Sequence, residues 1–238
     1  MDIPLKPIKP KRVSDQVFNQ LCELIYRGNL KPGEKLIPER ELAKAMNVSR
    51  TTVRDAIQRL CAMGLIVQRQ GQGTFVKSVS EKLENPISKA IEAQNATIED
   101  LLEVRIGLEC NAVSLAAVRA DESDILAMTR SIEEMQAAVK SGRLGTQADT
   151  SFHMAIAYAA KNPLHILIMR NFYDYLFHSV RENLASLYKE QENIDIILKQ
   201  HKEILAAIKA RDKKTAWEAM QNHIEFVQRY FKKIKSGR

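Results

Sequence analysis

Apolar residues recur every three or four positions through the first third of the chain, a spacing typical of amphipathic helices. The pattern predicts three helices, whose buried sides carry Val17, Phe18, Leu21, Leu24 and Ile25, then Leu42, Ala45 and Met46, and finally Val53, Ala56, Ile57 and Leu60. Pro38 suits the first position of the second helix, and Ser49 suits the N-cap of the third. Because only Asn47 and Val48 separate these two helices, the spacing is that of a helix-turn-helix.

Two short runs with strand-like composition follow the third helix, at residues 65–67 and 74–76. The segment Gln70-Gly71-Gln72-Gly73 between them is typical of a hairpin tip. Three helices followed by such a hairpin form a winged helix-turn-helix, which we expect over residues 1–77.

Helical spacing resumes at Thr97, which has the capping-box spacing with Asp100, and continues almost to the C-terminus. Breaks near residue 120 and at 141–145, 162–163, 190–193 and 211–212 divide this segment into six helices. No convincing alternating strand pattern interrupts them, so residues 97–238 are predicted to form an all-α bundle. Residues 78–96 are polar and weakly patterned, and we expect a linker with one short helix there. The predicted fold is mostly α.

The composition is that of an ordinary folded protein, with 45% hydrophobic and 27% charged residues among 238. It excludes disordered, collagen-like and coiled-coil classes. No stretch approaches the roughly 18 consecutive apolar residues of a membrane span, and the first ten residues lack a secretory signal, so we expect a cytoplasmic protein without a membrane partner. Cys22, Cys61 and Cys110 are odd in number and widely spaced, which leaves them as core residues.

The excess positive charge is confined to the first third of the chain. Residues 1–78 hold 14 Lys and Arg against 7 Asp and Glu, whereas residues 79–238 hold 22 of each. A basic module attached to a neutral one is typical of a protein that binds a polyanion, because Lys and Arg release condensed counterions from phosphates. A bias toward solubility, without a partner, is the alternative.

The third predicted helix carries Arg50, Thr51, Arg54 and Gln58 on the face turned away from its apolar stripe. In helix-turn-helix proteins the N-terminal part of this helix enters the major groove, where Arg binds guanine and Thr contacts a phosphate or a thymine methyl. An ordinary solvated face is the alternative, but the predicted wing and the confined charge favour DNA binding.

The segment from Arg27 to Val76 closely resembles the GntR family of bacterial transcription regulators. The resemblance is carried by Gly33-Glu34-Lys35-Leu36, Pro38-Glu39-Arg40-Glu41-Leu42-Ala43, the run from Val48 to Ile57 and Gly71-Gln72-Gly73-Thr74-Phe75-Val76. It implies that the helix-turn-helix contacts operator DNA and that the wing tip reaches toward the minor groove. The expected DNA-binding residues are Arg40, Ser49, Arg50, Thr51, Thr52, Arg54, Gln70, Gly71 and Gly73.

Ionisable residues interrupt apolar stripes of the second segment. His201 and His223 each lie within the stripe of one of the last two helices, while Asp149 and His153, four residues apart, share a face that continues toward the core. A buried carboxylate is protonated, paired or bound to a cation. Three imidazoles and a carboxylate suit a divalent transition metal; core histidines satisfied by backbone carbonyls are the alternative. His165 and His178 lie outside these stripes and are not candidates.

Arg105 is a fourth misplaced polar residue, set among Leu101, Leu102 and Leu108. A buried guanidinium requires a carboxylate or phosphate partner. That partner is either Glu109, one turn further along the same helix, or a bound anion.

This second segment resembles the FCD ligand-binding domain of the FadR subfamily of GntR regulators. The resemblance is carried by Asp100-Leu101-Leu102-Glu103-Val104-Arg105, Leu108-Glu109, the run from Asp149 to His153, Ala159-Ala160-Lys161-Asn162-Pro163, Gln200-His201 and Asn222-His223. In the metal-containing branch, residues placed like Asp149, His153, His201 and His223 ligate one metal ion, and a carboxylate effector binds beside it. The resemblance therefore implies one divalent ion per chain, zinc first with nickel or manganese as alternatives, and an effector role for Arg105.

The leading hypothesis is a homodimeric transcription regulator, not an enzyme. It would bind a pseudo-palindromic operator, and a small organic or sugar acid would control its DNA affinity from the helical domain, which would also mediate dimerisation. A metalloregulator that senses the ion itself and a metalloenzyme tethered to DNA are the alternatives.

Overall fold

A computed structural model describes residues 12–26, 30, 33–77, 90, 93–179 and 186–236 of the chain. The chain divides into two compact units, Met1–Ser78 and Val79–Arg238. The short helix expected within residues 78–96 falls almost entirely outside the described residues.

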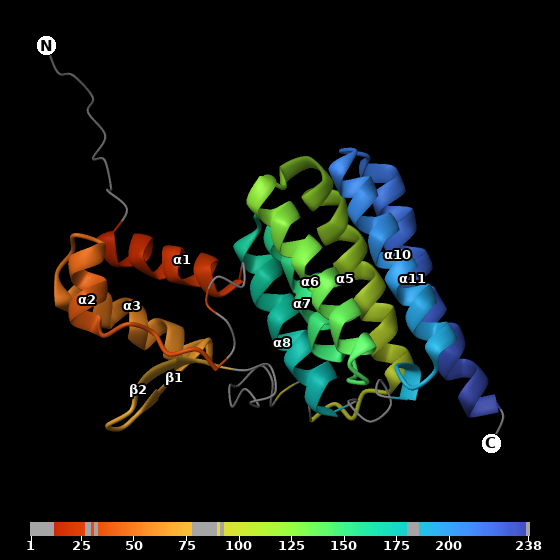
Figure 1. The fold of residues 1–238 in the computed structure, drawn as a ribbon, viewed down its shortest axis with the longest axis horizontal. Coiled ribbons are helices and arrows are strands. Elements are labelled where there is room, and N and C mark those ends of the chain that lie inside the picture. The colour runs from red at the N-terminus through yellow and green to blue at the C-terminus, as the bar shows by residue number, and fades with distance from the viewer. Residues whose placement is uncertain are drawn as a thin grey trace, which may run out of the picture. The chain divides into compact units, whose positions relative to one another are not determined.

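The described part of the first unit contains three helices and one hairpin, as the apolar pattern predicts (Figure 1). These elements are α1 (Val13–Tyr26), α2 (Glu39–Ala45), α3 (Arg50–Ala62), β1 (Ile66–Arg69) and β2 (Gly73–Val76). Asn47 adopts a left-handed φ of 51° directly after α2, and the Ser49 side chain caps α3 by accepting a hydrogen bond of 3.1 Å from the Thr52 backbone N–H. The winged helix-turn-helix is thus confirmed.

The hairpin pairs Ile66 with Val76 and Arg69 with Gly73 in antiparallel register. The segment from Glu34 to Leu36 also pairs with the hairpin: the Leu36 N–H donates to the Thr74 carbonyl at 2.8 Å, and the Val76 N–H donates to the Glu34 carbonyl at 2.8 Å. The run Gly33-Glu34-Lys35-Leu36 is too short for its alternation to mark a strand, which is why the sequence does not reveal it.

Side chains from all three helices form the core of the first unit. Val53, Ala56, Ile57 and Leu60 of α3 are fully buried and pack with Leu21 of α1. The opposite face of α3, which carries Arg50, Thr51 and Arg54, is exposed. Burial of the apolar side therefore determines which side of α3 is available to a partner.

The second unit is helical throughout its described part, and no strand is found there, as predicted (Figure 1). The helices whose bounds the structure describes there are α5 (Ile98–Arg119), α6 (Glu122–Lys140), α7 (Thr146–Ala159), α8 (Pro163–Ser179), α10 (Gln191–Lys209) and α11 (Lys213–Ser236). The Thr97 and Asp100 side chains form the expected capping box at the start of α5. The central helix α5 packs against α7, α10 and α11, and α7 also contacts α6 and α8.

The apolar stripes of these helices meet in a core that includes Leu102, Phe152, Ile197 and Met220. Cys22 and Cys110 are buried as expected, whereas Cys61 is half-buried beside the core of the first unit. Among the described residues, no helix is both long enough and apolar enough to cross a membrane.

Candidate metal centre

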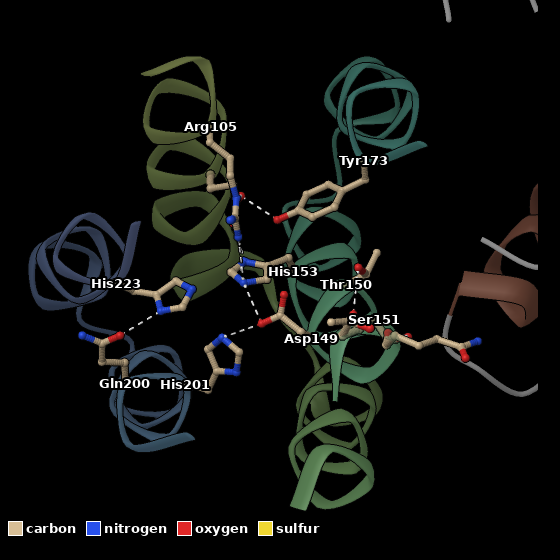
Figure 2. A network of polar contacts seen from close by, with 12 residues as sticks. Arg105, Asp149, Thr150, Ser151, His153, Tyr173, Gln200, His201 and His223 are labelled. Carbon is tan, nitrogen blue, oxygen red and sulfur yellow. Dashed lines mark hydrogen bonds and ion pairs between the residues drawn. The ribbon is translucent and has the colours of Figure 1, made fainter. Parts of the chain in front are cut away.

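The four residues predicted as metal ligands converge inside the second unit. Asp149 and His153 come from α7, His201 from α10 and His223 from α11, and one potential ligand atom from each lies within 4.8 Å of all the others. Figure 2 shows these side chains pointing toward one another from three helices. His201 is fully buried and the side chain of Asp149 is 14% exposed, so the cluster lies in the core rather than on the surface.

Asp149 is the centre of this arrangement. Its Oδ1 lies 3.3 Å from His201 Nε2 and 3.7 Å from His153 Nε2. The i, i+4 spacing along α7 brings Asp149 and His153 to one face of that helix, and packing of α10 brings His201 to the same carboxylate.

The electrostatics of the cluster favour neutral imidazoles at His201 and His223 beside an ionised carboxylate at Asp149. Burial lowers the pKa of His201 to about 3 and that of His223 well below its usual value. Burial alone would raise the pKa of Asp149, but His153, His201 and Arg105 outweigh it and hold that pKa below its usual range. Metal binding requires these protonation states of imidazole and carboxylate.

Several buried polar atoms of the cluster have no hydrogen-bond partner among the described residues. They include both ring nitrogens of His201 and Oδ1 of Asp149. Leaving such atoms unsatisfied costs roughly 1–3 kcal/mol each, and a cation bound between them would satisfy Oδ1 and one imidazole nitrogen together. The residues therefore fit a divalent transition metal ion.

Two further side chains orient the cluster from outside. The Nδ1 of His223 lies 3.0 Å from the side-chain oxygen of Gln200, which directs Nε2 of His223 toward the other three residues (Figure 2). The buried hydroxyl of Tyr188 hydrogen-bonds to Asp149, and burial together with that carboxylate raises the pKa of Tyr188 well above its usual value. Such contacts fix ligand geometry. Tyr188 carries no signal in the sequence that separates it from other core tyrosines.

Arg105 lies directly beside the cluster and is 2% exposed. Its Nε donates to Glu109 Oε1 at 2.5 Å, so the first of the two partners that the sequence left open is present. Its Nη2 lies 3.1 Å from His153 Nε2. Burial opposes the charge of both members of the pair, but each holds the other ionised: the pKa of Arg105 is raised and that of Glu109 is lowered.

Glu109 has two more partners, which the sequence did not indicate. The Tyr173 hydroxyl donates to Oε1 at 2.6 Å, and Oε2 forms an ion pair with His153 Nδ1. Burial lowers the pKa of His153, but Glu109 opposes that effect and raises it above its usual value.

His165, which the sequence set aside, is buried on α8 and does not belong to the four-residue cluster. The side chain of His178 lies outside the part of the chain that the structure describes.

The residues predicted to contact DNA lie at the start of α2, at the N-cap and first turns of α3, and at the tip of the hairpin. Most are exposed, namely Arg40, Ser49, Arg50, Thr51, Arg54, Gln70, Gly71 and Gly73. Thr52 is half-buried, and its hydroxyl lies 2.8 Å from that of Ser49, so these two side chains also serve the helix cap. Gly71 and Gly73 have positive φ values of 71° and 113°, which favour glycine at both positions of the tip.

The chain matches two protein families over separate ranges. The description "Bacterial regulatory proteins, gntR family" matches residues 13–76, and "FCD domain" matches residues 100–226. The matched ranges contain, respectively, the winged helix-turn-helix and all four residues of the cluster.

Two curated relatives are similar over most of their length. The HTH-type transcriptional regulator LutR of Bacillus subtilis (strain 168) is 34% identical over 207 residues, 86% of this chain and 94% of the relative. The putative L-lactate dehydrogenase operon regulatory protein of Escherichia coli (strain K12) is 32% identical over 232 residues, 95% of this chain and 89% of the relative. A solved structure described as Streptococcus agalactiae GntR has a TM-score of 0.51 and 25% identity, covering 91% of this chain and 100% of that one.

Proposed function

The chain belongs to the GntR family of bacterial transcription regulators and carries an FCD domain, and from this premise we propose that a small carboxylate bound beside a divalent metal ion controls its affinity for operator DNA. The observation that carries the proposal is the buried cluster of three histidines and one aspartate next to Arg105. Membership of a family of regulators replaces the metalloenzyme hypothesis.

Asp149, His153, His201 and His223 would hold the ion. Three imidazoles with one carboxylate are typical ligands for zinc, with nickel or manganese as alternatives. The ion would act as a Lewis acid and attract a carboxylate oxygen of the ligand.

A count of charges supports an anionic ligand. Arg105 and a divalent cation bring three positive charges to the site, whereas Asp149 and Glu109 bring two negative ones. With neutral histidines, one positive charge remains inside a buried site, where uncompensated charge is costly. A monocarboxylate held by Arg105 and the ion would neutralise it.

L-lactate is the first acid to test. One relative is named a putative L-lactate dehydrogenase operon regulatory protein, and lactate is a small monocarboxylate of the kind that the charge count favours. Pyruvate, glycolate, citrate and sugar acids complete the set.

On the DNA side, we propose a homodimer whose second units associate and whose two winged helix-turn-helix units bind a pseudo-palindromic operator in the cytoplasm. Arg50 and Arg54 would contact bases, Arg40 would contact a phosphate, and the tip from Gln70 to Gly73 would reach the adjacent minor groove. The carboxylate can change DNA affinity only by the ratio of its affinities for the DNA-binding and non-binding arrangements.

The test is a thermal-shift screen of these acids on the zinc-loaded chain, followed by fluorescence anisotropy with operator DNA selected from random duplexes. An acid that raises the unfolding temperature and changes operator affinity is expected. Arg105→Gln should abolish both responses, whereas Arg130→Gln, at an exposed position of α6, should retain them. Absence of any response to all of the acids would contradict the proposal.

The ion pair between Arg105 and Glu109 favours one alternative, a metalloregulator in which zinc itself is the signal. Arg105 already has a carboxylate partner within the chain and does not require an anion for its own burial. If free zinc without any acid switches operator binding across its physiological range, this alternative replaces the carboxylate sensor.

A further inference from the structure

Glu109 occupies the position between the predicted effector residue and the predicted metal ligands. It lies in the middle of α5 and is 1% exposed. Its Oε1 accepts hydrogen bonds from Arg105 Nε at 2.5 Å and from the Tyr173 hydroxyl at 2.6 Å, while its Oε2 pairs with His153 Nδ1. One carboxylate thus contacts side chains from α5, α7 and α8.

The contact with His153 decides which ring nitrogen faces the cluster. Since the ion pair with Glu109 requires a proton on Nδ1, the lone pair of a neutral His153 would lie on Nε2, on the side of Asp149. The neighbouring Arg105 Nη2, at 3.1 Å from Nε2, agrees with this assignment, since a guanidinium only donates hydrogen bonds. A carboxylate that accepts from the distal nitrogen of a ligating histidine makes that histidine a better metal ligand.

The contact with Arg105 has the opposite consequence for an anion. Glu109 already neutralises the guanidinium, and the Tyr173 ring covers it, with 5.5 Å from the guanidinium carbon to the ring centroid. A carboxylate that approaches Arg105 must therefore share the guanidinium with Glu109 or displace it.

We propose that Glu109 is a positioning residue that acts on the two halves of the site in opposite directions: it strengthens metal binding through His153 and weakens carboxylate binding through Arg105. This inference rests on the proposed function. It assigns to the chain's own carboxylate the control of how tightly an external carboxylate binds.

The experiment measures the affinities of the full chain for zinc and for acetate after the substitution Glu109→Gln. Glutamine has nearly the same shape as glutamate but carries no charge. Zinc affinity, measured by competition with a colorimetric chelator, is expected to fall 10–100-fold, the usual effect of losing such an outer carboxylate. Acetate affinity of the zinc-saturated protein, measured by isothermal titration calorimetry, is expected to rise by roughly tenfold, because Arg105 loses its internal competitor. Acetate is the probe because it contains the carboxylate and little else.

Glu103→Gln is the matched control, since it removes the same charge from an exposed position of the same helix. It should change neither affinity. A further pair of variants covers the case in which an unpaired Arg105 prevents folding: Arg105→Met alone, and Arg105→Met combined with Glu109→Gln. The combined variant should bind zinc 10–100-fold more weakly than the single one, because His153 loses its acceptor in both backgrounds.

The outcomes separate this inference from the proposed function. Opposite changes in the two affinities support it. Parallel changes, or no change, in a wild-type background that binds zinc and acetate would overturn it and leave the proposed function standing. A wild-type chain that binds no zinc, or binds zinc but no acetate, would overturn both.

Discussion

The ring of Phe152 is stacked on the imidazole of His201, with 4.4 Å between the ring centroids and 27° between the planes. Phe152 also meets His153 edge to face, with 5.7 Å between centroids. Since neither nitrogen of His201 has a hydrogen-bond partner within the described chain, the stacked ring of Phe152 orients this imidazole together with the 3.3 Å approach of Nε2 to Asp149 Oδ1.

Phe152→Leu is therefore expected to lower zinc affinity about tenfold, by loosening His201, and to lower the free energy of unfolding by roughly 1–2 kcal/mol. Phe231→Leu is the matched control, because Phe231 belongs to the same core on α11. It should lower stability by a similar amount and leave zinc affinity unchanged. Equal loss of zinc affinity in both variants would show that general packing, not the stacked ring, positions His201.

Removing the metal is expected to destabilise the full chain. At free zinc 100–1,000 times its dissociation constant, binding to the native state alone contributes roughly 3–4 kcal/mol, which corresponds to a fall on the order of 10 °C in unfolding temperature when a chelator is added. His201→Ala should abolish this sensitivity to chelator. His165→Ala should retain it at a lower starting temperature, because His165 is buried outside the cluster. Identical melting curves of the wild type with and without chelator would exclude a bound structural ion.

The cluster was predictable from sequence because histidine and aspartate stand out within apolar helical stripes. Asp149, His153, His201 and His223 each interrupt such a stripe, and burying the stripes in one bundle forces the four side chains inward. Which residues orient them was not predictable in the same way. Tyr173 and Tyr188 look like ordinary core tyrosines, and only the packing of α8 and the segment before α10 brings their hydroxyls to Glu109 and Asp149.

In the fold, too, local features were predictable from the sequence and long-range contacts were not. Caps and periodicity are local, so Ser49 and Thr97 could be identified as helix starts before any tertiary contact was known. The pairing of Leu36 with Thr74 joins residues far apart in the chain, and nothing local marks it. For Arg105 the sequence left two partners open, because an i, i+4 carboxylate and a bound anion satisfy a guanidinium equally well, and the structure shows the first.

Acid is expected to destabilise the chelator-treated chain. The pKa of His201 is about 3 and that of His223 is also lowered in the folded state, so below the unfolded value of about 6.5 the unfolded chain binds protons that these residues cannot take up when folded. His153 acts in the opposite direction, because its pKa is raised and it is protonated before unfolding. Between pH 6 and 5 the unfolded chain therefore binds between one and two more protons at these three histidines than the folded chain does.

That difference corresponds to a loss of roughly 2 kcal/mol of stability over this pH interval. The carboxylates of Glu109 and Asp149, with lowered pKa values, add a loss of the same sign as the pH falls further, below about 4.5. Urea unfolding at several pH values measures the effect. His223→Gln should reduce the slope between pH 6 and 5 by up to about one proton. A stability that is constant from pH 7 to 5 in the chelator-treated wild type would contradict the buried neutral state of these histidines.

Arg54 and Arg40 should affect DNA binding differently. Both are exposed, but Arg54 lies within α3, whose N-terminal half would face base edges, whereas Arg40 lies at the start of α2 and would face a phosphate. Arg54→Ala is expected to cost roughly 1–3 kcal/mol of discrimination between the selected operator and random DNA. Arg40→Ala should weaken binding to both DNAs alike and reduce the slope of log K against log salt by about one. Anisotropy titrations of the two variants on both DNAs, at several salt concentrations, measure these effects. If Arg54→Ala weakens both DNAs equally while Arg40→Ala changes the preference between them, the base-contacting and phosphate-contacting roles are assigned to the wrong arginines.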